Sequence, residues 1–455
     1  MAKIGFCAIS GSGMSALAQV LKYKGNDIYG SDRSFDQGKD QKNKKALSDL
    51  GIKIFPQDGS MLDKEFKVLY ASTAVEDTIP DIKRAKELNI PIKHRSDLLA
   101  ETFASYKYNI AVGGTSGKST TTAMIGYILD KADKKPLVIN GALLKNYENQ
   151  KGIPNVILND GEYCVIEADE SDGSIEKYTP YISVVNNITL DHKSIEELQA
   201  LFGDFAKRAL FGAVINKDCA NSKSLQKMNH NTISFGIKDK KADFYAENIT
   251  AIPNGTLYTF QNKEYKLNLI GAFNVANAMC AVACCSLLGI KPETSCQILE
   301  SFLSTKRRLE VLGISNNITV IDDFAHNPDK VAASMSALKS YNGRVLVMFQ
   351  PHGFSPMRLM GKEIMDSFIE YMSPDDILLL PEIFFAGGTV KRDISSLDLV
   401  NYAKRHNTDA RYFETRDELK QHLLNIAKPN DRIVLMGARD NSITDMGYEL
   451  LEKLK

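Results

Sequence analysis

The residues best suited to chemistry lie in a glycine-rich segment with one lysine, GGTSGKSTTT, at positions 113–122. The segment follows the apolar run YNIAVGG and precedes a helical pattern, a context in which backbone N–H groups and a helix N-terminus bind phosphate. Val112 stands where a Walker A loop has its first glycine, so this is a shorter GTxGKS(T) form. Lys118 is placed to reach a terminal phosphate, and Ser119 or Thr120 to hold Mg²⁺. The loop therefore predicts ATP binding through Gly114, Thr115, Ser116, Gly117, Lys118, Ser119 and Thr120.

Acidic residues end a second buried strand. The apolar run YCVIEAD (163–169) continues into Glu170, Ser171 and Asp172. Carboxylates at the carboxyl end of a strand beside a phosphate loop are hard oxygen ligands that suit Mg²⁺. These strand-end carboxylates are therefore candidate metal ligands, and an exposed acidic loop without a metal is the alternative interpretation.

A second glycine turn, GSGMSA at 11–16, follows the first strand and opens a helix. That is the context of a dinucleotide-type GxGxxG/A turn, in which glycines let the backbone approach a diphosphate. Ser31 and Asp32 close the next strand, where an acidic residue meets a ribose hydroxyl. The turn alone does not distinguish NAD from another nucleotide diphosphate, and a tight turn without ligand is the alternative. The candidate contacts are Gly11, Ser12, Gly13, Met14, Ser31 and Asp32.

The elements that must position these residues follow an α/β pattern. Buried strand-like runs alternate with helical patterns of about 10 to 15 residues, which predicts parallel sheets. Such runs begin near Lys3, near Tyr108 and near Gly343, and we expect three domains at 1–106, 107–311 and 312–455. Between Ala242 and Leu269 the pattern changes to alternation around Asn254-Gly255, which predicts a hairpin on the middle domain.

Composition excludes several classes of protein. The 455 residues carry 56 basic and 56 acidic side chains, a zero formal charge that argues against nucleic-acid binding. No apolar run of about 18 residues is present, and the N-terminus lacks a secretory signal pattern, so we expect no membrane span and a cytoplasmic location. The seven cysteines form no CxxC pair, which favours buried thiols in a reducing compartment over a zinc or disulfide framework.

Four further segments complete a recognisable set: GAFNVANA (271–278), RRLE (307–310), DDFAHNP (322–328) and QPHGFSPMR (350–358). Together with GTSGKSTTT and EADESD, they resemble the Mur ligases, ATP-dependent amide-forming enzymes that build the peptidoglycan stem peptide. The matches fall along nearly the whole chain in the family's order. The resemblance implies a Rossmann-like N-terminal domain for the UDP substrate, a central P-loop ATPase-type domain, and a Rossmann-like C-terminal domain for the amino acid.

The resemblance also implies roles for individual residues. It assigns Ser119, Glu167 and His192 to Mg²⁺ sites, although Ser194 departs from the family's usual acid after the histidine. It places Asn274, Asn277, Arg308 and Asp323 at ATP, with Arg308 neutralising the migrating phosphoryl charge. Some members carry a carbamylated lysine about where Lys207 lies; here we expect an ordinary solvated lysine. The implied catalytic set is Lys118, Glu167, His192 and Arg308.

The amine substrate is the point at which the sequence departs most from the family. His352 and Arg358 match residues that hold the carboxylate end of the substrates in the alanine-adding member, and His326 lies close by in the implied site. Gly353 replaces an arginine of that member, so a carboxylate contact is missing unless Arg358 or Lys391 supplies it. Restoring Gly353→Arg should then improve the use of L-alanine.

The function implied is the ATP-dependent joining of L-alanine to UDP-N-acetylmuramate through an acyl phosphate, by a monomer or weak dimer. EADESD favours the alanine-adding activity. RRLE and DDFAH are closer to the recycling member that attaches a whole tripeptide, which is the main alternative. Another phosphoryl-transfer enzyme, a dehydrogenase and a nucleotide switch without turnover are the remaining alternatives. A dehydrogenase would leave the phosphate loop and EADESD unexplained, and turnover of ATP with paired substrates would exclude the switch.

Overall fold

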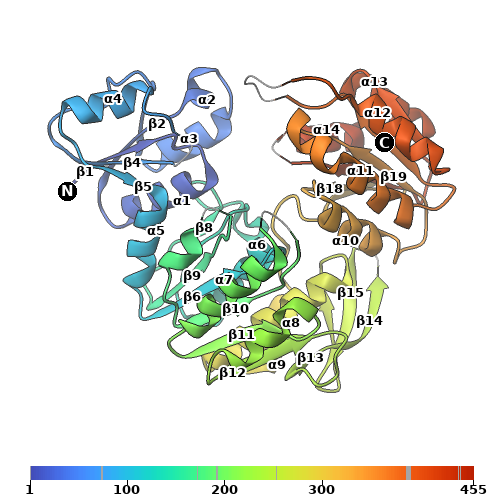
Figure 1. The fold of residues 1–455 in the computed structure, drawn as a ribbon, viewed down its shortest axis with the longest axis horizontal. Coiled ribbons are helices and arrows are strands. Elements are labelled where there is room, and N and C mark those ends of the chain that lie inside the picture. The colour runs from blue at the N-terminus through green and yellow to red at the C-terminus, as the bar shows by residue number, and fades with distance from the viewer. Residues whose placement is uncertain are drawn as a thin grey trace. The chain divides into compact units, whose positions relative to one another are not determined.

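The computed structural model describes residues 2–72, 75–171, 173–190, 193–252, 254–385, 391–438, 440 and 442–454. The chain divides into two compact units (Figure 1). The first comprises Met1–Glu247 and Ala276–Thr305, and the second comprises Asn248–Val275 and Lys306–Lys455. The mixed α/β class with parallel sheets, predicted from the alternating strand and helix patterns, is confirmed.

The first sheet of unit 1 has the strand order β3-β2-β1-β4-β5, with every pair parallel. This order places the ends of β1, β2 and β4 at the centre of the carboxyl edge, where open α/β sheets bind ligands. The strands are β1 (Lys3–Cys7), β2 (Asp27–Ser31), β3 (Lys53–Phe55), β4 (Phe66–Ala71) and β5 (Ile92–His94). The helices are α1 (Ser12–Tyr23), α2 (Arg33–Asp36), α3 (Gln41–Asp49), α4 (Pro80–Glu87) and α5 (Arg95–Ala104).

The second sheet of unit 1 has the order β13-β12-β11-β10-β6-β9-β7-β8, parallel except for β7 with β8. Its central strands are buried on both faces, which explains their continuous apolar runs. The strands are β6 (Tyr108–Gly113), β7 (Leu137–Ile139), β8 (Val156–Ile157), β9 (Tyr163–Glu167), β10 (Ile182–Val185), β11 (Gly212–Asn216), β12 (Thr232–Gly236) and β13 (Phe244–Tyr245). The helices are α6 (Lys118–Lys131), α7 (Ile195–Lys207), α8 (Ala272–Leu287), which begins in unit 2, and α9 (Pro292–Leu299), with 3₁₀ turns η1 (Lys145–Tyr147), η2 (Ser174–Lys177) and η3 (Ala220–Lys227).

The two sheets of unit 1 are joined by a shared core. Buried residues of α1 and α5 belong to the same apolar cluster as residues of β7, β9 and β10. Gln19 of α1 also donates to the Asn155 side chain (3.0 Å) and accepts from the Ile153 N–H (2.8 Å). Buried polar groups are stable only when they are paired, so these bonds fix the glycine turn of α1 beside the second sheet.

Unit 2 contains a small sheet and a large one. The small sheet, ordered β14-β15-β16, comprises β14 (Glu247–Ile252), β15 (Gly255–Phe260) and β16 (Lys263–Leu267). The large sheet, ordered β17-β18-β22-β19-β20-β21, comprises β17 (Glu310–Ser315), β18 (Ile318–Asp323), β19 (Val345–Phe349), β20 (Ile377–Pro381), β21 (Ala410–Phe413) and β22 (Arg432–Met436). The helices are α10 (Pro328–Leu338), α11 (Phe354–Tyr371), α12 (Ser396–Arg405), α13 (Arg416–Ile426) and α14 (Ser442–Lys453).

In the alternating segment before residue 270, the strands expected on either side of Asn254, β14 and β15, are neighbours in one sheet. A third strand, β16, was not expected; it pairs with β15 after a turn at Gln261-Asn262, where both residues have positive φ. The sheet groups with unit 2, where the Tyr341 hydroxyl donates to the Gly255 carbonyl at 2.6 Å, rather than with the middle of the chain. Periodicity predicts the strands of such a sheet but not the element on which they pack. The domain boundaries near 106 and 312 stay a prediction.

Two expectations from composition concern the described residues. No helix among them combines the length and the apolar character needed to cross a bilayer. All seven cysteines are free; six are buried, and Cys219 is half-buried. Burial raises the pKa of the Cys280 and Cys285 thiols well above the usual range, because the thiolate loses its hydration.

Candidate active site

The phosphate loop joins β6 to α6, and the side chains of Asn186 and Asn187 form hydrogen bonds with it. Gly114 has φ +129°, and a Cβ there would lie 3.0 Å from the Asn187 N–H nitrogen. Gly117 has φ +80°, and its Cβ would lie 2.1 Å from the Asn186 amide nitrogen. The Asn187 side-chain oxygen accepts from the Ser116 N–H (2.8 Å) and the Thr115 hydroxyl (2.9 Å). Both glycines are therefore required by the close approach of these supports.

Lys118 begins α6 and points back over the loop. Its ammonium donates to the Gly114 carbonyl (2.8 Å) and forms an ion pair with Glu170 (2.7 Å). The Glu170 side chain is 3% exposed, so this pair is largely screened from water. Burial disfavours the charged form of neighbouring Asp169, but Lys118, the Ser171 hydrogen bonds and Arg95 outweigh it and lower the pKa of Asp169. The loop thus combines a fixed cation with two carboxylates.

The Ser119 hydroxyl lies 3.0 Å from a Glu167 carboxylate oxygen, and the other oxygen of Glu167 accepts from the Gly141 N–H. A hydroxyl and a carboxylate beside a phosphate loop are the hard oxygen donors that Mg²⁺ prefers, so this part of the predicted metal set fits the ion. His192, the third member of that set, lies outside the described residues. Lys207 is exposed in the last turn of α7, as expected for a solvated lysine.

The two asparagines predicted at ATP have separate surroundings. The Asn277 side-chain oxygen accepts from the Asn186 amide at 2.8 Å, and the Thr121 hydroxyl lies 3.4 Å from it. Asn277 therefore supports the phosphate loop from α8. Asn274, one turn earlier on α8, donates to the Ile270 carbonyl at 2.8 Å, which satisfies a backbone acceptor just before the helix begins. Thr120 is buried in the first turn of α6.

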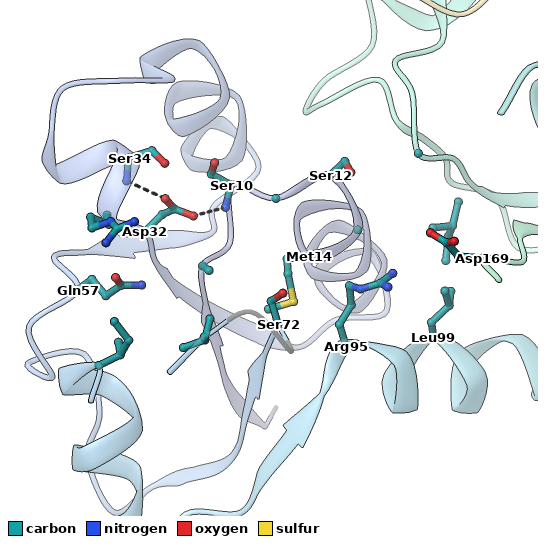
Figure 2. A pocket seen from close by; sticks show the side chains of 18 of the residues that line it. Ser10, Ser12, Met14, Asp32, Ser34, Gln57, Ser72, Arg95, Leu99 and Asp169 are labelled. Atoms are coloured by element: carbon teal, nitrogen blue, oxygen red, sulfur yellow. Dashed lines mark hydrogen bonds between the residues drawn. The ribbon is translucent and has the colours of Figure 1, made fainter. Parts of the chain in front are cut away.

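A cavity of about 690 Å³ opens at the N-terminal glycine turn of unit 1 (Figure 2). The predicted contacts Gly11, Ser12, Gly13, Met14 and Asp32 all line it. The same cavity is lined by Glu167, the last residue of β9 in the second sheet, and by Asp169, which follows that strand. One cavity therefore extends from the N-terminal glycine turn to the carboxylate beside Ser119.

Asp32 and Ser31 have different positions relative to this cavity. The two Asp32 carboxylate oxygens accept from the Ser10 N–H (2.9 Å) and the Ser34 N–H (2.8 Å), so Asp32 caps the short helix α2 (Figure 2). The Ser31 side chain is fully buried and donates to Asp81 instead. The structure thus brings Asp32, and not Ser31, to the cavity wall.

Arg95 is a cavity residue that sequence reasoning missed. It begins α5 directly after β5, and its side chain extends toward Asp169 (Figure 2). A Cβ on Gly13 would lie 2.9 Å from both Cδ and Nη1 of Arg95, so the glycine leaves room for the guanidinium beside the turn. A cation next to a diphosphate-type turn is a favourable partner for phosphate. The signal available was an arginine at the carboxyl end of a short strand in the first sheet.

The double arginine of unit 2 splits into a buried and an accessible residue. Arg307 is buried; it pairs with Asp322 (3.2 Å) and donates to the Gly437 carbonyl (2.6 Å). The Arg308 guanidinium lies 4.7 Å from the Phe324 ring centroid and is only partly buried. Arg307 therefore holds the sheet together, and Arg308 keeps its charge at the surface of the unit.

Asp323 and His326 lie at the end of β18. The Asp323 oxygens accept from the Ser334 hydroxyl (2.6 Å) and the Leu309 N–H (3.1 Å), and burial raises the pKa of this carboxyl. His326 contacts His352, with ring centroids 5.5 Å apart. Burial lowers the pKa of His326 to about 4, and its Nδ1 lies 2.8 Å from the Phe324 carbonyl oxygen. Since a carbonyl accepts, Nδ1 carries the proton and Nε2 is left as an acceptor.

Arg358, the other predicted contact in this unit, is already engaged. It donates to the Lys391 carbonyl (2.7 Å) and to the Ser355 hydroxyl (3.0 Å), and it forms an ion pair with Asp393. Arg358 lies on α11, which follows the loop after β19, and its charge is compensated within the unit.

Comparison with known proteins agrees with this arrangement along the chain. Three family models match: Mur ligase family, catalytic domain, at residues 3–107; Mur ligase middle domain at 112–285; and Mur ligase, glutamate ligase domain, at 307–439. The UDP-N-acetylmuramate–L-alanine ligase of Sulfurihydrogenibium sp. is 34% identical over 99% of this chain and 98% of its own length. That of Geotalea uraniireducens is 34% identical over 100% and 98%.

Solved structures give the same result. The crystal structure of the UDP-N-acetylmuramate–alanine ligase of Thermotoga maritima superposes with a TM-score of 0.82 at 26% identity, covering 100% of this chain and 99% of that one. A murein peptide ligase of Psychrobacter arcticus shares the fold at 21% identity, with a TM-score of 0.68 and coverage of 100% and 99%. The phosphate loop, the cavity and the relatives lead to one conclusion: the chain belongs to the Mur ligase family, the ATP-dependent ligases that its motifs predicted.

Proposed function

We propose that this chain joins L-alanine to UDP-N-acetylmuramate, with conversion of ATP to ADP and phosphate. The curated relatives that are 31–34% identical over almost the whole chain bear this activity in their names. The observation that carries the proposal is the cavity lined by both Gly11–Met14 and Glu167. A substrate whose diphosphate lies at the glycine turn has its sugar end directed toward the phosphate loop.

The reaction requires activation of a carboxylate, because oxide is a very poor leaving group. The carboxylate of the UDP-sugar attacks the terminal phosphorus of ATP, ADP leaves, and an acyl phosphate forms. The amine of L-alanine then attacks the acyl carbon; the C–O bond to phosphate breaks, and the amine loses a proton. Both steps depend mainly on positioning and charge neutralisation, which is why no nucleophilic side chain is needed.

Unit 1 supplies the groups for the first step. The N–H groups of the loop from Gly114 to Ser119 bind phosphate oxygens, and Lys118 exchanges its contact with Glu170 for one with the terminal phosphate. Ser119 and Glu167 would hold Mg²⁺, together with His192 as the family resemblance implies. When bound, the ion neutralises charge on the phosphate oxygens. Arg95 pairs with the diphosphate of the UDP-sugar.

Unit 2 supplies one group for the phosphoryl charge and two for the amino acid. We assign Arg308 to the phosphoryl charge, and His326 and His352 to the amino acid. Because His326 is neutral at pH 7, its Nε2 accepts a hydrogen bond from the incoming amino group. Asp323 positions the segment around Leu309 and Ser334, and Arg358 positions the loop after β20.

The direct test is phosphate release from ATP with UDP-N-acetylmuramate and a panel of single amino acids and short peptides. L-alanine should give the largest kcat/KM, and omission of the UDP-sugar should abolish release. A tripeptide preferred over L-alanine by a large factor would transfer the assignment to the peptide-recycling activity. We further propose a cytoplasmic monomer or weak dimer, for which light scattering across a concentration series is the check.

A further inference from the structure

The loops after β19 and β20 of unit 2 lie side by side at the carboxyl edge of the large sheet. The Gly353 N–H donates to the Phe384 carbonyl at 3.0 Å, and the Phe384 N–H donates to the Pro351 carbonyl at 2.8 Å. These reciprocal bonds fix the residues that follow, Phe354 and Phe385, with ring centroids 5.8 Å apart. The edge formed by the carboxyl ends of parallel strands is where such sheets bind ligands.

Gly353 cannot readily be replaced by the arginine of the alanine-adding relatives. Its φ is +75°, a region that L side chains rarely adopt, and a Cβ would lie 3.2 Å from Pro356 Cδ. Gly353→Arg would therefore strain the turn that opens α11, and the expectation that it restores a carboxylate contact stays a prediction. A cation for the substrate must come from another position.

The two alternatives expected from the sequence are compensated within the unit. Lys391 and Arg358 both pair with Asp393, at 2.9 Å for Lys391. The hydrogen bonds of Lys391 and Arg358 lower the pKa of Asp393 to about 2, so this carboxylate stays charged throughout the physiological range. Neither cation is available to a second carboxylate without giving up its partner.

Arg392 has different surroundings from Lys391 and Arg358. Its guanidinium carbon lies 4.2 Å from the Phe385 ring centroid and 5.9 Å from that of Phe354. Among the described residues no carboxylate forms an ion pair with it, and residues 386–390, which are not described, contain no acid. Stacking uses the flat face of the guanidinium and leaves the N–H edges for a planar anion. The positive charge of Arg392 thus lies over Phe354 and Phe385, the residues that follow Gly353 and Phe384.

We propose that Arg392 binds the α-carboxylate of the incoming amino acid and so determines specificity for a free amino acid over an amide. The inference rests on the proposed function and adds to it the residue that replaces the missing arginine. Phe354 and Phe385 hold the guanidinium in place, since an aromatic pair restricts a side chain that is otherwise exposed.

The test compares L-alanine with L-alaninamide, which keeps the amine and lacks the carboxylate, in the phosphate-release assay at saturating ATP and UDP-N-acetylmuramate. The wild type should prefer L-alanine. Arg392→Ala should raise the KM for L-alanine about 10- to 100-fold, the value of a charge-assisted pair, and leave kcat and the KM for alaninamide nearly unchanged. Arg392→Lys should fall between, because a point charge replaces a bidentate fork.

Arg405→Ala is the matched control, because Arg405 also lies over an aromatic ring, Tyr402 at 6.0 Å, on α12 of the same unit. It should leave both KM values unchanged. An Arg392→Ala enzyme that keeps the wild-type KM for L-alanine and the wild-type preference over alaninamide would overturn the inference while the proposed function stands. A wild type that releases no phosphate with L-alanine would overturn the proposed function itself.

Discussion

The Lys118 ammonium lies 2.7 Å from a Glu170 carboxylate oxygen, so the lysine that we assign to the terminal phosphate of ATP is already paired with a buried acid. The pair has two consequences. It holds the side chain over the loop before nucleotide binds, and it leaves a nearly inaccessible carboxylate behind if the lysine is removed.

Lys118→Ala should therefore abolish phosphate release and also destabilise unit 1. We expect a loss of at least about 100-fold in kcat, as for other charge-stabilising groups, and a stability loss of about 1–3 kcal/mol from the unpaired Glu170. Turnover and thermal melting measure the two effects separately.

A second variant separates the lysine's two roles. In Lys118→Ala/Glu170→Gln the buried charge is gone, so the melting temperature should recover while activity stays lost. Lys207→Ala, an exposed lysine at the end of α7, should leave both unchanged. Near-normal turnover of Lys118→Ala would contradict the role given to the loop.

Glu167→Gln should raise the Mg²⁺ concentration needed for half-maximal activity by at least about 10-fold. The reason is that Ser119 and Glu167, 3.0 Å apart, are the hard oxygen donors beside the loop. A Mg²⁺ titration of phosphate release is the measurement, with Glu162→Gln, an exposed glutamate before β9, as control. An unchanged Mg²⁺ requirement would remove Glu167 from the metal site.

Gly13→Ala should weaken binding of UDP-N-acetylmuramate about 10- to 100-fold, because the new Cβ displaces Arg95 from the cavity. Calorimetry with the UDP-sugar measures this, and wild-type protein should bind the UDP-sugar but not NAD. The control is Gly203→Ala on α7, where the nearest neighbour of a Cβ is Met228 at 3.9 Å. Tight NAD binding without UDP-sugar binding would refute the assignment of the glycine turn.

His326 should make unit 2 less stable in acid. Burial lowers its pKa to about 4 in the folded chain, against about 6.5 when unfolded. The unfolded chain thus binds the proton more readily, and the resulting stability, at most about 3 kcal/mol, is present above pH 6.5 and lost as pH falls toward 4. Urea unfolding from pH 7.5 to 4 should show a shallower pH dependence in His326→Asn than in wild type. The exposed His406→Asn serves as control, and equal slopes for His326→Asn and wild type would contradict the prediction.

The sequence predicted those features that local chemistry determines. The phosphate loop, the glycine turn and the strand ends at Glu167 and Asp323 are short segments whose residue types and order suffice to identify them. The pairing of Lys118 with Glu170 and of Asp393 with two cations could not be predicted, because it depends on side chains that tertiary packing brings together. Ser31 shows the same limit: its position at the end of β2 suggested a ligand contact, but its buried hydroxyl donates to Asp81 instead.

Arg95 and Arg392 illustrate a second reason why parts of the site could not be predicted from the sequence. Each is a single arginine outside any motif, and only the cavity beside Gly13 or the rings of Phe354 and Phe385 give it a role. The spacing of such residues carries no periodic or motif signal. The strand order of the sheets determines which of these residues lie close together.

The measurement that tests the central claim most directly is the amine dependence of phosphate release. With ATP, Mg²⁺ and UDP-N-acetylmuramate present, we predict that release requires an amine, that L-alanine gives the highest kcat/KM among single amino acids and short peptides, and that one amide forms for each phosphate released. Release that proceeds without any amine, or that is driven by a tripeptide far better than by L-alanine, would contradict the account.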